Sequence, residues 1–309
     1  MGTDPQGLSV ADASNAPLGP ARPWAAWSML GPAALGLAVV AGLPLIYTLA
    51  LALSQSTLGR PLAAWAGLAQ FQHLLRDSVF FETLLRTGLY AVPSSLIQLA
   101  LGLGLALLLQ GVRQGRWLSS LILLPLMTPP VLVGVAWKLL LAPAGGLFNG
   151  WLLHLGVLDA PLSVLGSDTW ALPAVVLADT WQWLPFVVIL CLAALQTLPS
   201  DVHEAARLEG ASELNVFVHI SLPQLAPSLL GIFLLREVMA LKTFDVVYIL
   251  TAGGPGRSTT LASYEIWKTG LHNFDIGLAA AQTLLFSLFV GLVTWPVLKA
   301  LQWVERHTG

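Results

Sequence analysis

Six apolar segments, each long enough to cross a lipid bilayer as a helix, constrain the fold of this chain more than any other feature. They lie at about residues 28–53, 83–110, 117–141, 170–195, 227–250 and 278–303. A transmembrane helix needs about 20 apolar residues, and it satisfies its own backbone hydrogen bonds in lipid. Only 10% of the chain is charged. These segments predict an all-α integral membrane protein with six transmembrane helices and both termini on one side.

The N-terminal segment differs in composition from the rest of the chain. Residues 1–26 are rich in Gly, Pro, Ala and Asp, and they lack the basic start of a secretory signal. The expected organisation is therefore a disordered leader at 1–26 and a membrane domain at 27–309.

Prolines and polar residues interrupt the third and fourth segments. The third contains Pro125, Pro129 and Pro130, and the fourth contains a polar stretch that begins at Asp179 and ends in Pro185. Broken helices occur in membranes where they pack against protein or line a cavity. These segments therefore indicate a path for a polar solute.

The fifth segment carries four ionisable residues, which cannot all face lipid. They are Arg236, Glu237, Lys242 and Asp245. Lys242 and Asp245 are three residues apart, so in a continuous helix they could pair on one face.

A charged stretch at 200–223 separates the fourth and fifth segments. Asp201 can cap a short helix with Glu204 three residues later, and Gly210 can end that helix in a left-handed conformation. Ser212 can cap a second short helix, which Pro223 is expected to end or turn toward the membrane. Residue types alone leave open a solvated amphipathic linker.

The spacing within this stretch resembles the EAA loop of the membrane subunits of binding-protein-dependent ABC importers. Glu-Ala-Ala, three residues, Gly, nine residues and Ile-x-Leu-Pro are met by Glu204, Ala205, Ala206, Gly210, Ile220, Leu222 and Pro223. The resemblance implies a cytoplasmic coupling loop at 196–226 that seats in a cleft of an ATPase subunit. The residues expected to make that contact are Asp201, Glu204, Ala205, Ala206, Arg207, Glu209 and Gly210. Relatives commonly have Asp-Gly where this chain has Glu209-Gly210.

Four further stretches resemble the carbohydrate branch of these permeases, the maltose and glycerol-phosphate type. They are Trp183-Leu-Pro-Phe186, Ala194-Leu-Gln-Thr-Leu-Pro199, Leu241-Lys-Thr-Phe-Asp245 and Leu250-Thr-Ala-Gly-Gly-Pro255. The substrate contacts implied by this resemblance are Met127, Gln182, Trp183, Met239, Lys242 and Thr243, with Asp245 orienting Lys242. Trp183 would stack on a sugar ring. Equally, each of these side chains could simply pack helices together.

The resemblance also implies partners and a location. A multi-pass subunit in a bacterial-type plasma membrane, with both termini cytoplasmic, would receive a sugar or sugar-like solute from an external binding protein. A second related permease and two copies of an ATPase subunit would complete the importer. Lys242 leaves open an anionic polyol or glycerol phosphate as the solute. An ion-coupled secondary transporter that uses Glu237, Lys242 and Asp245 is the alternative from another class.

Several other kinds of chemistry find no support in the sequence. None of the four lysines follows a glycine, so the chain has no P-loop, and ATP and Mg²⁺ are expected on the partner ATPase. The six histidines and single cysteine show no metal-ligand spacing, which predicts no metal and no cofactor in this chain. A net charge of −2 gives no basic patch for nucleic acid. The expected role is therefore a non-catalytic transport subunit.

Overall fold

The computed structural model describes residues 23–110 and 115–308, and it divides into two compact units at Ala50. From Pro23 onward, the first unit consists of helix α1 (Pro23–Ala52), whose last two residues belong to the second unit. Its Leu30–Ala52 stretch is long and apolar enough to span a bilayer. Residues 1–22 of the predicted leader, and residues 111–114 of the turn before the third segment, lie outside the described residues.

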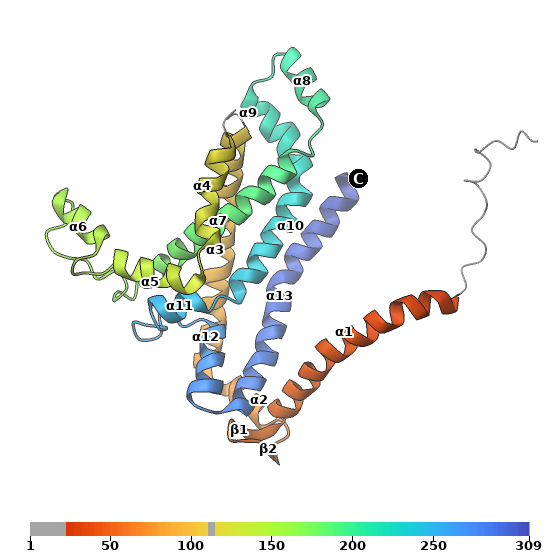
Figure 1. Cartoon of the computed structure of the whole chain (residues 1–309), viewed down its shortest axis with the longest axis vertical. Coiled ribbons are helices and arrows are strands. Elements are labelled where there is room, and N and C mark those ends of the chain that lie inside the picture. The colour runs from red at the N-terminus through yellow and green to blue at the C-terminus, as the bar shows by residue number, and fades with distance from the viewer. Residues whose placement is uncertain (1–22, 111–114, 309) are drawn as a thin grey trace, which may run out of the picture. The chain divides into compact units, whose positions relative to one another are not determined.

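The described part of the second unit consists of helices joined by loops, with one short antiparallel hairpin in which Ser54 pairs with Trp65 (Figure 1). Its elements are β1 (Ser54–Thr57), β2 (Arg60–Trp65), α2 (Ala69–Arg76), α3 (Ser78–Gln110), α4 (Gly115–Met127), α5 (Pro130–Leu140), α6 (Leu147–His154), α7 (Ala171–Leu195), α8 (Ser200–Leu208), α9 (Glu213–Val216), the π-helical turn η2 (Phe217–Ser221), α10 (Leu222–Leu241), α11 (Asp245–Leu250), α12 (Ala262–Trp267), the π-helical turn η3 (Lys268–His272) and α13 (Ile276–Thr308). The hairpin, α2 and α6 were not expected from the sequence.

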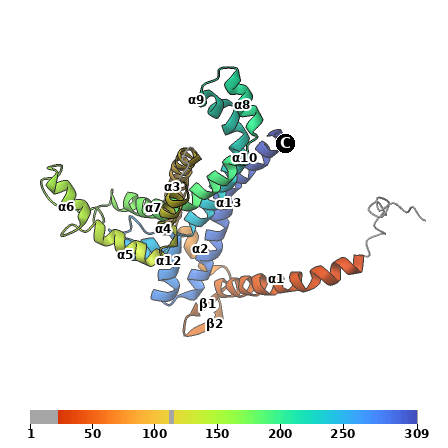
Figure 2. The same ribbon diagram turned by 45° about the horizontal axis from the view of Figure 1, so that its top comes forward.

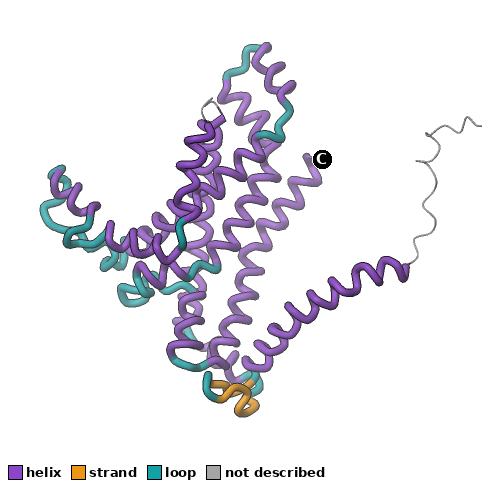
Figure 3. The backbone as a smooth tube through the Cα atoms, viewed as in Figure 1, coloured by secondary structure: helices purple, strands orange, loops and turns teal. Residues whose placement is uncertain are grey.

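Helices α3, α7, α10 and α13 run side by side as the bundle of the second unit (Figure 2). Hydrophobic clusters hold them together, such as Ala106 and Val187 with Leu225, and Leu84 with Ala281. Figure 3 shows α8 and α9 together at one end of this bundle and the hairpin at the opposite end. The two ends therefore expose different kinds of structure.

Helix α3 shows why the bundle suits a membrane. Its polar residues Thr83, Thr87, Ser94 and Gln98 recur at helical spacing and are buried against neighbouring helices. Its large apolar residues, for example Leu85, Leu89, Leu96 and Leu101, are exposed. Because lipid is as apolar as leucine, this arrangement places the polar stripe where other helices can satisfy it.

Among the described residues, five helices are long and apolar enough to cross a membrane. A sixth crossing is present if α4 and α5, which bend by 105° at Thr128 and Pro129, form one broken span. The prolines of the third apolar segment predicted this break. Of the six predicted spans, the second, fourth and sixth correspond to α3, α7 and α13.

The fifth predicted span, 227–250, is wrong as a single helix. The helix that covers the first part of this segment begins at Glu213, runs on through η2 and α10, and stops at Leu241. Of the two alternatives expected for Pro223, ending the second short helix is wrong, because the helix continues through η2 into α10. Pro223 lies in the first turn of α10, directly after the π-helical turn, where the missing N–H of proline is tolerated.

Candidate functional site

A polar pocket lies where the fifth span breaks. Residues Lys242, Thr243 and Phe244 are not helical, and α11 begins again at Asp245. The break leaves a cavity of about 260 Å³. Its lining comes from α5 (Pro130), from α7 (Asp179, Gln182, Trp183), from α10 (Met239), from the break itself (Lys242, Thr243, Phe244) and from α11 (Asp245, Val246). The cavity is thus formed by segments that are distant in sequence.

Five of the six residues predicted to contact substrate line this pocket: Gln182, Trp183, Met239, Lys242 and Thr243. Met127, the sixth, ends α4 with 78% of its surface exposed and is outside the lining. Lys242 and Asp245 both line the pocket, but they form no ion pair in the part of the chain that the structure describes. The helix break separates them, so they do not share the helical face on which the expected pairing depended.

Asp179, which lines the pocket, forms a buried ion pair with Arg236 between α7 and α10. Both side chains are 1% exposed. Gln98 of α3 accepts a hydrogen bond from Arg236 Nε, and its own Nε2 donates to Asp179 Oδ2 at 2.9 Å. The network therefore ties three helices of the bundle together at one level.

Sequence reasoning missed this network. It singled out Arg236 as a charge that could not face lipid, and Asp179 as a polar residue inside a span, without pairing them. The usable signal was that a buried guanidinium requires a carboxylate from another span. Gln98 offered no signal of its own, since a single amide in an apolar segment has many explanations.

The ion pair is linked to the pocket through Trp183 and Asp179. The Arg236 guanidinium carbon lies 5.5 Å from the centre of the Trp183 ring, a cation–π geometry. Gln182 Nε2 donates to the Thr128 carbonyl at 3.2 Å, where the α4–α5 break frees that carbonyl. Asp179 Oδ1 and Gln182 Oε1 are buried and have no partner among the described residues. Two lining residues thus hold unused acceptor oxygens.

The charged loop forms two short helices, as its sequence predicted. Helix α8 ends at Leu208, and Gly210 follows with φ at +86°. The Ser212 side chain accepts a hydrogen bond from Asn215 N at 3.4 Å and caps α9. Gly210 therefore takes the left-handed conformation for which a residue without Cβ is favoured.

The predicted coupling residues lie on the surface of this loop. Asp201, Glu204, Ala205, Glu209 and Gly210 are exposed, and Ala206 is half-buried. The side chain of Arg207 lies outside the described residues. Two leucines that the sequence reasoning did not select are also exposed, Leu208 by 90% and Leu214 by 70%. Charged and apolar side chains are therefore both exposed on this loop.

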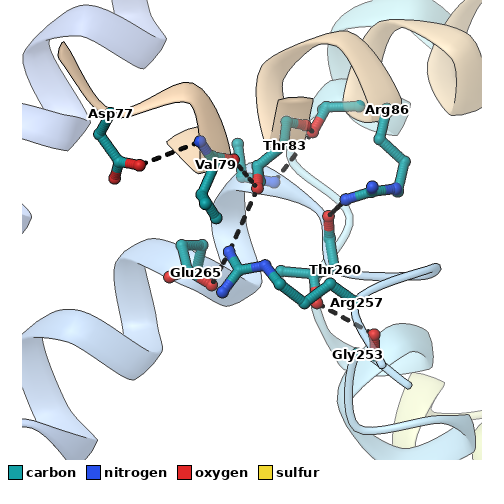
Figure 4. Close-up of polar contacts among 10 residues, drawn as sticks. Asp77, Val79, Thr83, Arg86, Gly253, Arg257, Thr260 and Glu265 are labelled. Atoms are coloured by element: carbon teal, nitrogen blue, oxygen red, sulfur yellow. Dashed lines mark hydrogen bonds and ion pairs between the residues drawn. The ribbon is translucent and has the colours of Figure 1, made fainter. Parts of the chain in front are cut away.

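At the opposite end of the bundle, two arginines fix the loop between α11 and α12 (Figure 4). Arg257 pairs with Glu265 of α12 at 3.0 Å and donates to Thr83 Oγ1 of α3 at 3.5 Å. Arg86 of α3 donates to the Thr260 carbonyl at 3.4 Å. These contacts hold α12 and its preceding loop against α3.

Comparison with known proteins gives consistent similarities. Residues 83–307 match the family model described as "Binding-protein-dependent transport system inner membrane component". The chain is 36% identical over 282 residues to the probable ABC transporter permease protein y4oQ of Sinorhizobium fredii, covering 89% of this chain and 90% of that one. It is 34% identical to the trehalose/maltose transport system permease protein MalF of Thermococcus litoralis, covering 83% and 86%.

A solved structure has the same fold. It is the crystal structure of a bacterial ABC transporter involved in the import of the acidic polysaccharide alginate, with a TM-score of 0.78. The match covers 93% of this chain and 96% of that one at 22% identity.

Proposed function

Because the chain belongs to the family of binding-protein-dependent transport system inner membrane components, we propose that it carries a neutral sugar through the pocket at the α10–α11 break. The observation that carries this proposal is the pocket itself, which combines an aromatic face at Trp183 with side-chain oxygens on the half-buried Thr243 and the exposed Asp245. Sugar hydroxyls are donors for such oxygens, and a ring face can pack on an indole. One relative, which is named for trehalose/maltose transport, supports the same class.

The charges around the pocket favour a neutral solute over an anion. Asp179 and Asp245 line it together with Lys242, while the guanidinium of Arg236 is held by Asp179, Gln98 and the Trp183 ring. Arg236 is therefore not free to bind a phosphate or carboxylate. Lys242, which is exposed, keeps an anionic polyol or glycerol phosphate as the second candidate, and one relative is named for sn-glycerol-3-phosphate transport.

Replacing Lys242 by glutamine distinguishes the two solute classes. We expect uptake of radiolabelled maltose or trehalose to change by less than about twofold, because a neutral sugar makes no charge-assisted hydrogen bond to the ammonium. If the solute is anionic, loss of the lysine should instead lower glycerol 3-phosphate uptake about tenfold or more, because the variant loses a charge-assisted hydrogen bond to the solute. Uptake is measured in proteoliposomes that contain the assembled importer.

We propose that the α8–α9 loop binds the partner ATPase subunit and transmits the movement caused by ATP hydrolysis to the bundle. We place this loop and both termini on the cytoplasmic side of a bacterial plasma membrane. An external binding protein delivers the solute, a second related permease completes the pathway, and two ATPase subunits bind ATP and Mg²⁺. Ligand and nucleotide then bias the inward- and outward-facing states through their different affinities for each.

Reversing the charge of Glu204 tests the coupling role. Because Glu204 is exposed on α8, Glu204→Lys should leave the fold intact while weakening ATPase association and lowering uptake about tenfold, equivalent to ~1.4 kcal/mol. Co-purification of the ATPase and ATP-driven uptake are the measurements. Glu82→Lys is the matched control, since Glu82 is exposed on α3 near the other end of the bundle. Equal behaviour of the two variants would contradict the assignment.

Reconstitution separates the importer from an ion-coupled transporter. The assembled complex should transport only with ATP, the binding protein and all subunits present. Transport by this chain alone, driven by an ion gradient in liposomes, would contradict the proposal.

A further inference from the structure

Helix α3 contributes no lining residue to the pocket, yet two of its side chains form hydrogen bonds to residues that do. Gln98 Nε2 donates to Asp179 Oδ2, and the Tyr90 hydroxyl donates to Thr243 Oγ1 at 3.4 Å. Thr243 is half-buried and lies in the non-helical break between α10 and α11. Helix α3 therefore acts on the pocket through side chains of the lining.

Tyr90 is completely buried at the point where α10 ends. It is 0% exposed and packs in a hydrophobic cluster with Ala178 of α7 and with Ala240 and Leu241, the last two residues of α10. A phenol hydroxyl in such surroundings loses its hydrogen bonds to water, so it requires a partner within the protein. Thr243 Oγ1 is that partner. Packing thus fixes the ring of Tyr90, and the break between the two helices supplies the acceptor for its hydroxyl.

The direction of this hydrogen bond decides what Thr243 can offer to a solute. A threonine hydroxyl carries one hydrogen and two acceptor lone pairs. Tyr90 occupies one lone pair, and the Thr243 hydroxyl has no other hydrogen-bond partner among the residues that the structure describes. Its own hydrogen is therefore left to donate into the cavity that Thr243 lines. Accepting a bond from Tyr90 also polarises the Thr243 hydroxyl, which makes it a stronger donor.

We infer that Tyr90 is a positioning residue for the solute site, which orients the Thr243 hydroxyl so that it donates to a hydroxyl, ring or glycosidic oxygen of a sugar. Tyr90 does not touch the solute itself, because its side chain is fully buried. The inference rests on the proposed function, since it requires the sugar to bind in this pocket. It also adds a determinant of specificity: a sugar that lacks the oxygen facing Thr243 leaves this donor unpaired and is transported less well.

Tyr90→Phe tests the inference, because it keeps the ring and removes only the hydroxyl. In the assembled importer, the initial rate of radiolabelled maltose uptake should fall about threefold, which corresponds to the loss of one neutral hydrogen bond. The same external binding protein serves every variant, so its own affinity for maltose cancels in the comparison. Tyr264→Phe is the matched control and should keep the wild-type rate, since Tyr264 is a buried tyrosine of the same hydrophobic cluster outside the pocket lining.

Variants of Thr243 separate orientation of its hydroxyl from simple packing by Tyr90. Thr243→Val has no hydroxyl to orient, so adding Tyr90→Phe to it should not lower uptake further. Thr243→Ser keeps the hydroxyl, and adding Tyr90→Phe to it should again lower uptake about threefold. A tyrosine that only supports the packing of the helices would lower uptake by the same factor in all three backgrounds.

Three results would overturn the inference while the sugar assignment stands. If Tyr90→Phe transports maltose at the wild-type rate, the Tyr90 hydroxyl does not position the site. If the loss persists in the Thr243→Val background, Tyr90 acts through packing. If Thr243→Val alone transports maltose at the wild-type rate, Thr243 does not contact the solute. Uptake of glycerol 3-phosphate without maltose or trehalose by the unaltered importer would overturn the sugar assignment and the inference together.

Discussion

Replacement of Arg236 by methionine should destabilise the bundle more than any other single substitution considered above. The change leaves the Asp179 carboxylate buried at 1% exposure without its cation, and it removes the donor that Gln98 Oε1 accepts from. Removing one partner of a buried ion pair costs about 3–5 kcal/mol, because the remaining charge stays desolvated. We expect a large fall in the fraction of detergent-solubilised protein that remains monodisperse after heating. Size-exclusion chromatography of the heated protein measures this fraction.

Two controls separate the buried charge from the loss of a large side chain. The double variant Arg236→Met with Asp179→Leu removes both charges, and it should recover much of the lost stability because apolar replacements of buried pairs are often close to neutral. Arg257→Met breaks the pair with Glu265, in which Arg257 is 38% exposed, and should change stability by less than about 1 kcal/mol. If Arg236→Met lowers thermal stability no more than Arg257→Met does, the Arg236–Asp179 ion pair does not hold the bundle together.

Gly102→Ala should produce the second large effect, through the contact between α3 and α7. A Cβ at Gly102 would lie 2.6 Å from Val187 Cγ1 and 3.1 Å from Val187 Cβ. Valine is stiff at χ1 and cannot move its methyl groups aside, so the two helices must separate. Overpacking of this kind costs about 1–3 kcal/mol. The same thermal assay on the solubilised protein measures this loss of stability.

The neighbouring glycine gives a matched control on the same helix. A Cβ at Gly104 would meet nothing within 4 Å, so Gly104→Ala should be neutral or stabilising through its higher helix propensity. Adding Val187→Ala to Gly102→Ala should restore stability, since it removes the methyl groups that the new Cβ meets. Equal stability of Gly102→Ala and Gly104→Ala would show that α3 and α7 do not depend on this close approach.

Hydropathy located the spans well, because the cost of exposing polar backbone or side chains to lipid applies to every residue in turn. The apolar segments at 83–110, 170–195 and 278–303 correspond closely to α3, α7 and α13. The helix ends in the charged loop were also predicted from the sequence, where Ser212 caps α9 and Gly210 takes a positive φ. The hairpin at Ser54–Trp65 was not readable, since two short strands in a polar stretch give little periodicity.

The fifth span shows where local patterns gave the wrong answer. Apolar residues continue on both sides of Lys242, Thr243 and Phe244, and no glycine or proline marks the break. The break became visible only in the structure, where α11 packs against α5 and opens the pocket. Gly134 of α5 allows this packing, because a Cβ there would lie 2.8 Å from Ile249 of α11.

Residue order alone was enough to predict long apolar helices suited to a membrane, the bend in the third segment and the two short helices of the charged loop. These features follow from residues close together in the chain, through hydropathy, proline and helix capping. The pairing of Arg236 with Asp179 and Gln98, and the cavity shared by residues of α5, α7, α10 and α11, depend on how the helices pack in three dimensions. A buried charge requires a partner, but which of several distant polar residues supplies it depends on how the helices rotate and pack against one another.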